Sequence, residues 1–426
     1  MKPEVSANRY PQTDITGENM KREENNMTLS VCFFAESPVK IWGMTCRERM
    51  VRVLGAMGGV RIVADLAVLH ANAPVLILRA DHLIDDRLIH YLAATPDMLL
   101  LNEDGGEKTA VAAHVSGSIA HQTHTAMTDP EKPLPPGVRI QTLDSLALSF
   151  QEKLRKFDPP FVLPVSADRQ RRLERGLFAW SYKGVTDLVT KWVWPHPAQW
   201  AVRQCVRLGI QPNHVTLTSL ILVVLAGGLF IRGQYGWGLA VAWVMTFLDT
   251  VDGKLARVTV TASRFGHYFD HLIDLFSPPV WYMLWGLGLK YAYPGGLFYA
   301  LDRVIWLMLI GYVAGRLVEL TFKKCLGRFD IFCWQPMDSC FRLVTARRNP
   351  CLILLTFFTL WGRPDLGLLA VAFWTLLSSV FLLLRLAWAS LIRIREGSLT
   401  TWFVDARRSR DLNSPAVRWF IRGTPD

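Results

Sequence analysis

The pattern of apolar and polar positions divides the chain into two halves. Residues up to about 165 combine short apolar runs with scattered charge, whereas residues from about 211 to 395 contain repeated apolar runs. Each run approaches the roughly 20 residues that a helix needs to cross a bilayer. We expect an α-helical polytopic membrane domain with six transmembrane helices, at about 214–231, 236–257, 263–289, 296–321, 349–362 and 366–390.

The first half alternates segments typical of strands and of helices. The expected strands and helices are Val31–Phe34, Arg47–Met57, Val60–Val63, Pro74–Leu78, Asp85–Ala93 and Asp97–Leu101, in that order. This alternation predicts an α/β layered, Rossmann-like domain with a largely parallel sheet.

The segment between the two halves is basic and rich in tryptophan. It contains Arg169, Arg171, Arg172 and Arg175, followed by Trp180, Trp192, Trp194 and Trp200. Such amphipathic segments suit the bilayer interface, so we expect one or two juxtamembrane helices along the cytoplasmic surface. The formal net charge of +11 agrees with contact with anionic lipid and gives no separate reason to expect nucleic acid as a partner.

These patterns predict a domain order and a topology. We expect a flexible leader at 1–28, the α/β domain at 29–160, a linker with juxtamembrane helices at 161–210, the membrane domain at 211–395 and a cytoplasmic tail at 396–426. The loop 322–348 is strongly basic, whereas the loops on the opposite side carry few cations. The positive-inside rule then places the N-terminal domain, the 258–262 turn, the basic loop and the C-terminus in the cytoplasm.

Four acids lie within the second and third expected spans: Asp249, Asp252, Asp270 and Asp274. Positions 249 and 252 share one helix face, and positions 270 and 274 share a face of the next helix. An ionisable group inside a membrane costs roughly 2.5 to 3.5 kcal/mol, so these acids need a partner. Clustered carboxylates favour Mg²⁺ or Mn²⁺. A buried ion-pair network with Lys254, Arg257 and Arg264 is the alternative, although it does not obviously pair all four acids.

The spacing D-x2-D-G-x2-A-R-x8-G-x3-D-x3-D, from Asp249 to Asp274, resembles the signature of the CDP-alcohol phosphotransferase family. This resemblance implies an integral membrane transferase that moves a substituted phosphate from a CDP-alcohol, such as CDP-diacylglycerol, to an acceptor alcohol in phospholipid or phosphodiester biosynthesis, with release of CMP. It also implies one or two Mg²⁺ or Mn²⁺ ions held by Asp249, Asp252, Asp270 and Asp274, with Asp274 as the general base. A homodimer is implied by the same resemblance.

The resemblance also assigns residues to the CDP-alcohol: Asn213, Thr216, Asp252, Gly253, Ala256, Arg257, Ser263 and Gly266. Small residues at 253, 256 and 266 would leave room for the nucleotide. Arg257 suits a phosphate because its guanidinium is permanently charged and bidentate. Asn213 and Thr216 belong to a Pro-Asn-x-x-Thr segment, which also carries helix-start signals for the first span.

The α/β half is similar to the nucleotidyltransferase-like domain of bifunctional inositol-phosphate cytidylyltransferase/phosphotransferase relatives. Asp81 follows a strand where such enzymes place an acid near the metal and the sugar nucleotide. However, the first strand continues into Phe34-Ala-Glu-Ser-Pro38 and lacks a glycine-rich loop whose amides could hold a triphosphate. We expect a degenerate, structural or regulatory domain.

Other functions stay open from the sequence. One alternative is a bifunctional enzyme whose first domain also makes the CDP-alcohol. Another is a divalent-cation transporter, because carboxylates on paired spans can line an ion path; that function leaves the fixed glycine, alanine and arginine positions unexplained. A catalytically silent scaffold is a third. The acceptor, a small alcohol or a phosphorylated alcohol, is not fixed by the signature.

Overall fold

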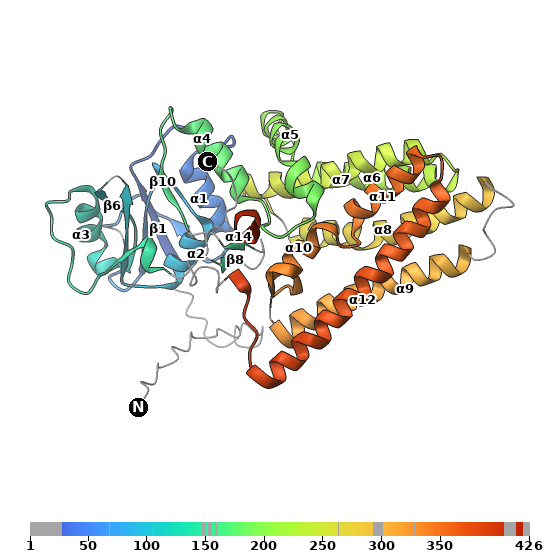
Figure 1. The fold of residues 1–426 in the computed structure, drawn as a ribbon. Coiled ribbons are helices and arrows are strands. Elements are labelled where there is room, and N and C mark those ends of the chain that lie inside the picture. The colour runs from blue at the N-terminus through green and yellow to red at the C-terminus, as the bar shows by residue number, and fades with distance from the viewer. Residues whose placement is uncertain are drawn as a thin grey trace.

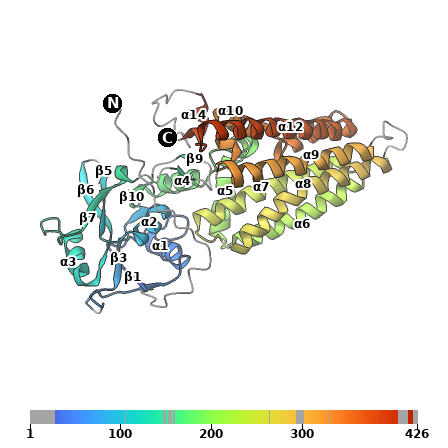
Figure 2. The same cartoon turned by 90° about the horizontal axis from the view of Figure 1, so that it is seen from below.

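The computed structural model describes residues 28–67, 69–104, 106–146, 150–151, 156–157, 160–262, 264–292, 301–327, 329–403 and 415–420. Nearly all of the expected leader, and Ser263, lie outside these residues. Figures 1 and 2 show a sheet-containing domain at one end and a bundle of long helices at the other.

The N-terminal domain is built on a six-stranded sheet in the order β2-β1-β3-β6-β5-β7. Its strands are β1 (Leu29–Phe34), β2 (Val60–Ile62), β3 (Pro74–Arg79), β5 (Met98–Asp104), β6 (Glu107–Ser116) and β7 (Arg139–Thr142). β1 runs parallel to β2 and β3, and β5 runs parallel to β7, but β6 is antiparallel to both of its neighbours. The short β5–β6 connection forces this reversal, because a parallel pair needs a long crossover. The sheet is therefore mixed.

Layers of helix cover the two faces of the sheet. On β3, Leu76 and Leu78 belong to the core shared with α1 (Cys46–Gly55) and α2 (Asp86–Ala94), whereas Val75 and Ile77 belong to the core on the side of α3 (Gly117–Thr128). Successive strand residues point to opposite faces, so both layers are buried by one continuous apolar strand. Four smaller elements complete the domain: β4 (His82–Ile84), β8 (Phe150–Gln151), β9 (Lys156–Phe157) and β10 (Val162–Pro164).

The linker forms α4 (Gln170–Trp180), a π-helical turn at Val189–Val193 and α5 (Pro195–Arg207). α4 does not lie free on a membrane surface, because Leu173, Leu177 and Phe178 are buried in the core of the α/β domain. α5 packs on the membrane domain and leaves Trp200 66% exposed. The juxtamembrane placement of this segment stays a prediction.

The second half forms the helices α6 (Pro212–Ile231), α7 (Tyr235–Val258), α8 (Arg264–Ala292), α9 (Leu301–Thr321), α11 (Arg348–Leu360) and α12 (Pro364–Glu396). Each coincides with an expected span. Three segments among the described residues are long and apolar enough to cross a membrane: Pro212–Ile231, Leu301–Gly327 and Pro364–Glu396. The chain is a membrane protein, and the spanning role of α7, α8 and α11 stays a prediction.

Close contacts between helices fix the position of α8. A Cβ added at Gly288 would lie 2.1 Å from the backbone oxygen of Phe230 on α6. Trp281 of α8 donates its indole N–H to the Val223 oxygen of α6 at 2.9 Å. Small residues allow such close approach of backbones in membrane bundles. The loop after α9 forms a π-helical turn (Phe322–Gly327), a 3₁₀ turn (Ile331–Cys333) and α10 (Pro336–Val344), and α14 (Pro415–Phe420) follows α12.

Candidate active site

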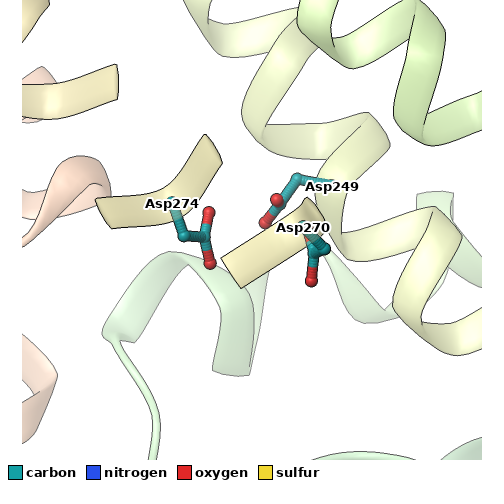
Figure 3. Close-up of side chains that lie close together, drawn as sticks. All are labelled: Asp249, Asp270 and Asp274. Carbon is teal, nitrogen blue, oxygen red and sulfur yellow. The ribbon is translucent and has the colours of Figure 1, made fainter. Parts of the chain in front are cut away.

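Three of the predicted metal ligands meet between α7 and α8. Asp249 comes from α7, and Asp270 and Asp274 lie one turn apart on α8 (Figure 3). One carboxylate oxygen from each of the three lies within 4.8 Å of the other two. Carboxylate oxygens are the donors that Mg²⁺ and Mn²⁺ prefer, so this set fits a divalent cation.

Asp252 lies on the same helix as Asp249 but has different surroundings. It is 4% exposed, and the hydroxyl of Thr216 on α6 donates to its Oδ2 at 2.7 Å. Its Oδ1 is buried and has no hydrogen-bond partner within the part of the chain that the structure describes. A buried carboxylate oxygen without a partner is costly, and a bound cation would satisfy it. The ligand role of Asp252 stays a prediction.

The acids open onto a cavity of about 170 Å³. Five of the predicted site residues line it: Asp249, Gly253, Arg257, Asp270 and Asp274. Asn213, Thr216, Asp252, Ala256 and Gly266 are not among its lining residues, and Ser263 lies outside the described residues. The cavity also has walls that the sequence did not predict: Lys183, Thr186, Asp187, Thr190, Thr250, Lys254, Arg342, Arg347, Arg348 and Asn349.

Arg348, at the start of α11, supplies positive charge to the acids. Its guanidinium donates to Asp249 Oδ2 and to Asp274 Oδ1, each at 2.6 Å. The side chain of Asp274 is 43% exposed and that of Asp249 is 17% exposed. The basic loop before α11 was the only sequence signal for this contact, and the positive-inside rule already accounted for it.

Two further arginines line the cavity, Arg342 and Arg347. Arg347 is ion-paired with Glu319 of α9, which also pairs with Arg316 at 2.7 Å. Arg342 of α10 lines the same cavity. The cavity thus combines carboxylates with guanidinium groups, a composition that suits an anionic ligand beside a cation.

Residues 181–190, which we name the strap, form a third wall. The carboxylate of Asp187 accepts from the backbone N–H of Thr190 and from Nδ2 of Asn349, each at 3.0 Å, which ties the strap to α11. The carbonyl of Ser181 accepts from Arg257 at 2.5 Å and from Lys254 at 3.1 Å. The strap therefore contacts both α7, which carries Lys254 and Arg257, and α11, which carries Asn349.

Tyr182, in the strap, packs against Lys254 of α7. The Lys254 ammonium is 3.1 Å from the centre of its ring. Burial raises the pKa of Tyr182, although the nearby Arg257 partly opposes this effect. The phenol is therefore neutral at ordinary pH and acts as a face for the Lys254 cation.

Asp81 of the α/β domain already has protein partners. It accepts from Arg79 Nε at 2.9 Å and lies 2.6 Å from His82 Nδ1. Burial raises the pKa of Asp81, but the hydrogen bonds from His82 and Arg79 outweigh burial, so the net change lowers the pKa. This carboxylate is stabilised as an ion within its own domain.

Trp42 lies between β1 and α1. The indole is 2% exposed and donates to the Glu174 carbonyl of α4 at 2.9 Å. Its ring also packs against Phe178, with the ring centres 5.8 Å apart. Trp42 therefore ties the chain between β1 and α1 to α4.

Comparison with known proteins gives the family. A family model described as CDP-alcohol phosphatidyltransferase matches residues 210–325. The archaetidylinositol phosphate synthase of Pyrococcus horikoshii is 37% identical over 166 residues, which cover 39% of this chain and 77% of that protein. The bifunctional IPC transferase and DIPP synthase of Rubrobacter xylanophilus is 28% identical over 163 residues, which cover 38% of this chain and 34% of that protein.

A shorter match has a related name. The phosphatidylinositol phosphate synthase of Streptomyces avermitilis is 38% identical over 71 residues, which cover 16% of this chain and 29% of that protein. The chain thus spans most of the archaeal relative and about a third of the other two. Because the archaeal relative is matched over most of its length, and the family model covers the helices that carry the acids, the chain belongs to the CDP-alcohol phosphatidyltransferase family.

Proposed function

We propose that the chain transfers the substituted phosphate of a CDP-alcohol, preferably CDP-diacylglycerol, to a phosphorylated alcohol with release of CMP. The cavity supports this proposal, because it combines the acids of α7 and α8 with the guanidinium groups of Arg342, Arg347 and Arg348. The acids suit a cation on the pyrophosphate, and the arginines suit a second phosphate. The matched relatives named for inositol phosphate lipids support an inositol phosphate as acceptor.

The acids of α7 and α8 have two proposed roles, metal binding and proton transfer. Asp249, Asp252, Asp270 and Asp274 would hold one or two Mg²⁺ or Mn²⁺ ions, which neutralise the pyrophosphate oxygens and make CMP a better leaving group. Asp274 is the more exposed carboxylate of the Arg348 pair and is the proposed general base. It takes the proton of the acceptor hydroxyl as the new O–P bond forms and the bond to the CMP oxygen breaks.

The nucleotide side of the site is proposed from the signature. Arg257 lines the cavity and would bind phosphate oxygens of the CDP-alcohol. Asn213, Thr216, Gly253, Ala256, Ser263 and Gly266 complete the proposed CDP-alcohol site. We further propose six spans, a cytoplasmic active site and α/β domain, and a homodimer.

A panel of acceptors tests the function. Purified protein in detergent is incubated with CDP-diacylglycerol, Mg²⁺ and one acceptor at a time, and the lipid products are weighed by mass spectrometry. We expect products from inositol phosphate or glycerol phosphate, and none from free inositol, glycerol or serine. Absence of CMP release with every CDP-alcohol would refute the transferase, and uptake of Mn²⁺ into liposomes without a CDP-alcohol would favour a transporter.

A further inference from the structure

The C-terminal end of α7 lies against the α/β domain. α7 ends at Val258, and the last carbonyl groups of any helix lack partners within the helix. On α1, Arg49 donates to the Val258 oxygen at 2.9 Å, and Arg52 donates to the Thr259 oxygen at 2.8 Å. Residues three apart share a helix face, so α1 presents both cations to the negative end of α7.

Arg49 is also held from its own domain. Its NH2 group donates to both carboxylate oxygens of Asp86, on α2, each at 3.0 Å. The side chain of Arg49 is 9% exposed. A guanidinium stays charged, so its burial is costly unless partners surround it, and here those partners fix its direction. One side chain therefore links α2, α1 and the end of α7.

Apolar packing extends across the same junction. Leu255 and Val258 of α7 belong to one buried cluster with Leu54 of α1 and Leu88 of α2. The junction therefore has a dry apolar part beside the hydrogen bonds to the helix end. Such a contact resists separation of the domain from the helix.

A second contact reaches the same turn of α7 through α4. Trp42 of the α/β domain is bonded to Glu174 through its indole and through its backbone N–H, at 2.9 and 3.3 Å. α4 then leads into Ser181, whose carbonyl accepts from Arg257. Arg257 thus lies between two contacts, one to its side chain and one to the next residue along α7.

We propose that Arg49 and Arg52 are positioning residues of the transfer reaction, which hold the end of α7 so that Arg257 faces the cavity. The α/β domain then contributes to catalysis by fixing the position of α7. This inference rests on the proposed function. The two arginines touch no reacting atom, and they act through the backbone next to Arg257.

Hydrogen exchange tests the placement without any need for activity. The full-length protein is compared with Arg49→Ala, Arg52→Ala and the control Arg61→Ala, which changes an exposed arginine on β2 of the same domain. We expect faster exchange of the amides at residues 253–262 in the first two variants and no change in the control. Unchanged exchange in Arg52→Ala, an exposed position that tolerates truncation, would overturn the inference even if Arg49→Ala failed to fold.

Kinetics test the consequence for the reaction. We expect kcat/KM for the CDP-alcohol to fall about tenfold in Arg49→Ala and about two- to threefold in Arg52→Ala, as loss of a charged hydrogen bond predicts. Arg49→Lys should recover part of the loss, because an ammonium still donates to Val258. In a double-mutant cycle with Arg257→Ala, the Arg49 effect should shrink.

Two results separate the possible failures. Purely additive effects of Arg49→Ala and Arg257→Ala, at an unchanged melting temperature, would contradict action through Arg257. Absence of CMP release by the unsubstituted protein would refute the proposed function, and the exchange experiment would still decide whether the arginines hold α7.

Discussion

The acids of the cavity differ in their protein partners. Arg348 donates to Asp249 and Asp274, whereas Asp270 forms no ion pair among the described residues. Asp270 thus depends most directly on a bound cation or on Arg257 for its charge balance. A carboxylate with this role is sensitive to loss of charge even when its shape is preserved.

Asp270→Asn tests the metal site. The amide keeps the shape of the side chain but removes one negative charge and one anionic ligand, so we expect CMP release to fall by roughly 100-fold or more. Release of CMP from CDP-diacylglycerol at saturating Mg²⁺ is the measurement. Asp302→Asn is the control, because Asp302 is 72% exposed and pairs only with Lys290 among the described residues. Retained metal-dependent release by Asp270→Asn would contradict the site.

Arg348→Gln separates the guanidinium from the cation. Without this positive charge, Asp249 and Asp274 should attract a divalent ion more strongly, and we expect the half-saturating Mn²⁺ concentration to fall about threefold or more. The maximal rate should fall at the same time, because the proposed binding site for the acceptor phosphate loses a cation. A titration of CMP release against Mn²⁺ gives both values. Arg363→Gln, at an exposed pair with Asp365, should change neither.

Gly253→Ala tests whether the glycine makes room for Arg257. A Cβ at position 253 would lie 3.2 Å from Arg257 NH2, so the guanidinium must move. We expect the KM for the CDP-alcohol to rise several-fold. Gly236→Ala is a matched control on the same helix, because no atom lies within 4 Å of its added Cβ. A rise in KM in Gly253→Ala that is absent from Gly236→Ala therefore reports on Arg257.

At the scale of elements, the helices were predictable and their neighbours were not. Apolar run length predicted the two acid-bearing helices at 236–257 and 263–289, and the structure has them at Tyr235–Val258 and Arg264–Ala292. The sequence of α4 predicted an apolar face. It did not predict that the α/β core covers this face. The helical spacing of apolar residues, one every three or four positions, gives no information on contacts between distant segments of the chain.

Gly288→Ala tests the packing of α6 on α8. The added Cβ would lie 2.1 Å from the Phe230 backbone oxygen, and a backbone atom cannot rotate away as a side chain can. The helices must separate, and we expect a loss of about 1 to 3 kcal/mol in stability, seen as a lower melting temperature in detergent. Gly228→Ala on α6 has no atom within 4 Å of its added Cβ, so it gains helix propensity without a collision and should melt no lower than the unsubstituted protein.

At the scale of the whole molecule, the cavity is assembled from three parts of the chain. The signature supplies the acids, but the strap and the α10–α11 region supply cavity walls from outside the 210–325 match. Arg348 lies 99 residues from Asp249 and 74 from Asp274, so spacing in the sequence could not place it there. The signature therefore predicted the acid cluster, and only the folded chain shows the cationic residues beside it.

The α/β domain is expected to lack nucleotidyl transfer. The sequence after β1 lacks a glycine-rich loop, and Asp81 is already bonded to Arg79 and His82. Full-length protein given CTP, Mg²⁺ and inositol phosphate or glycerol phosphate should therefore release no pyrophosphate. The assay is best made in Asp270→Asn, in which the membrane site is disabled and the α/β domain is untouched. Pyrophosphate release there would restore the bifunctional enzyme, because only the α/β domain would remain to cleave CTP.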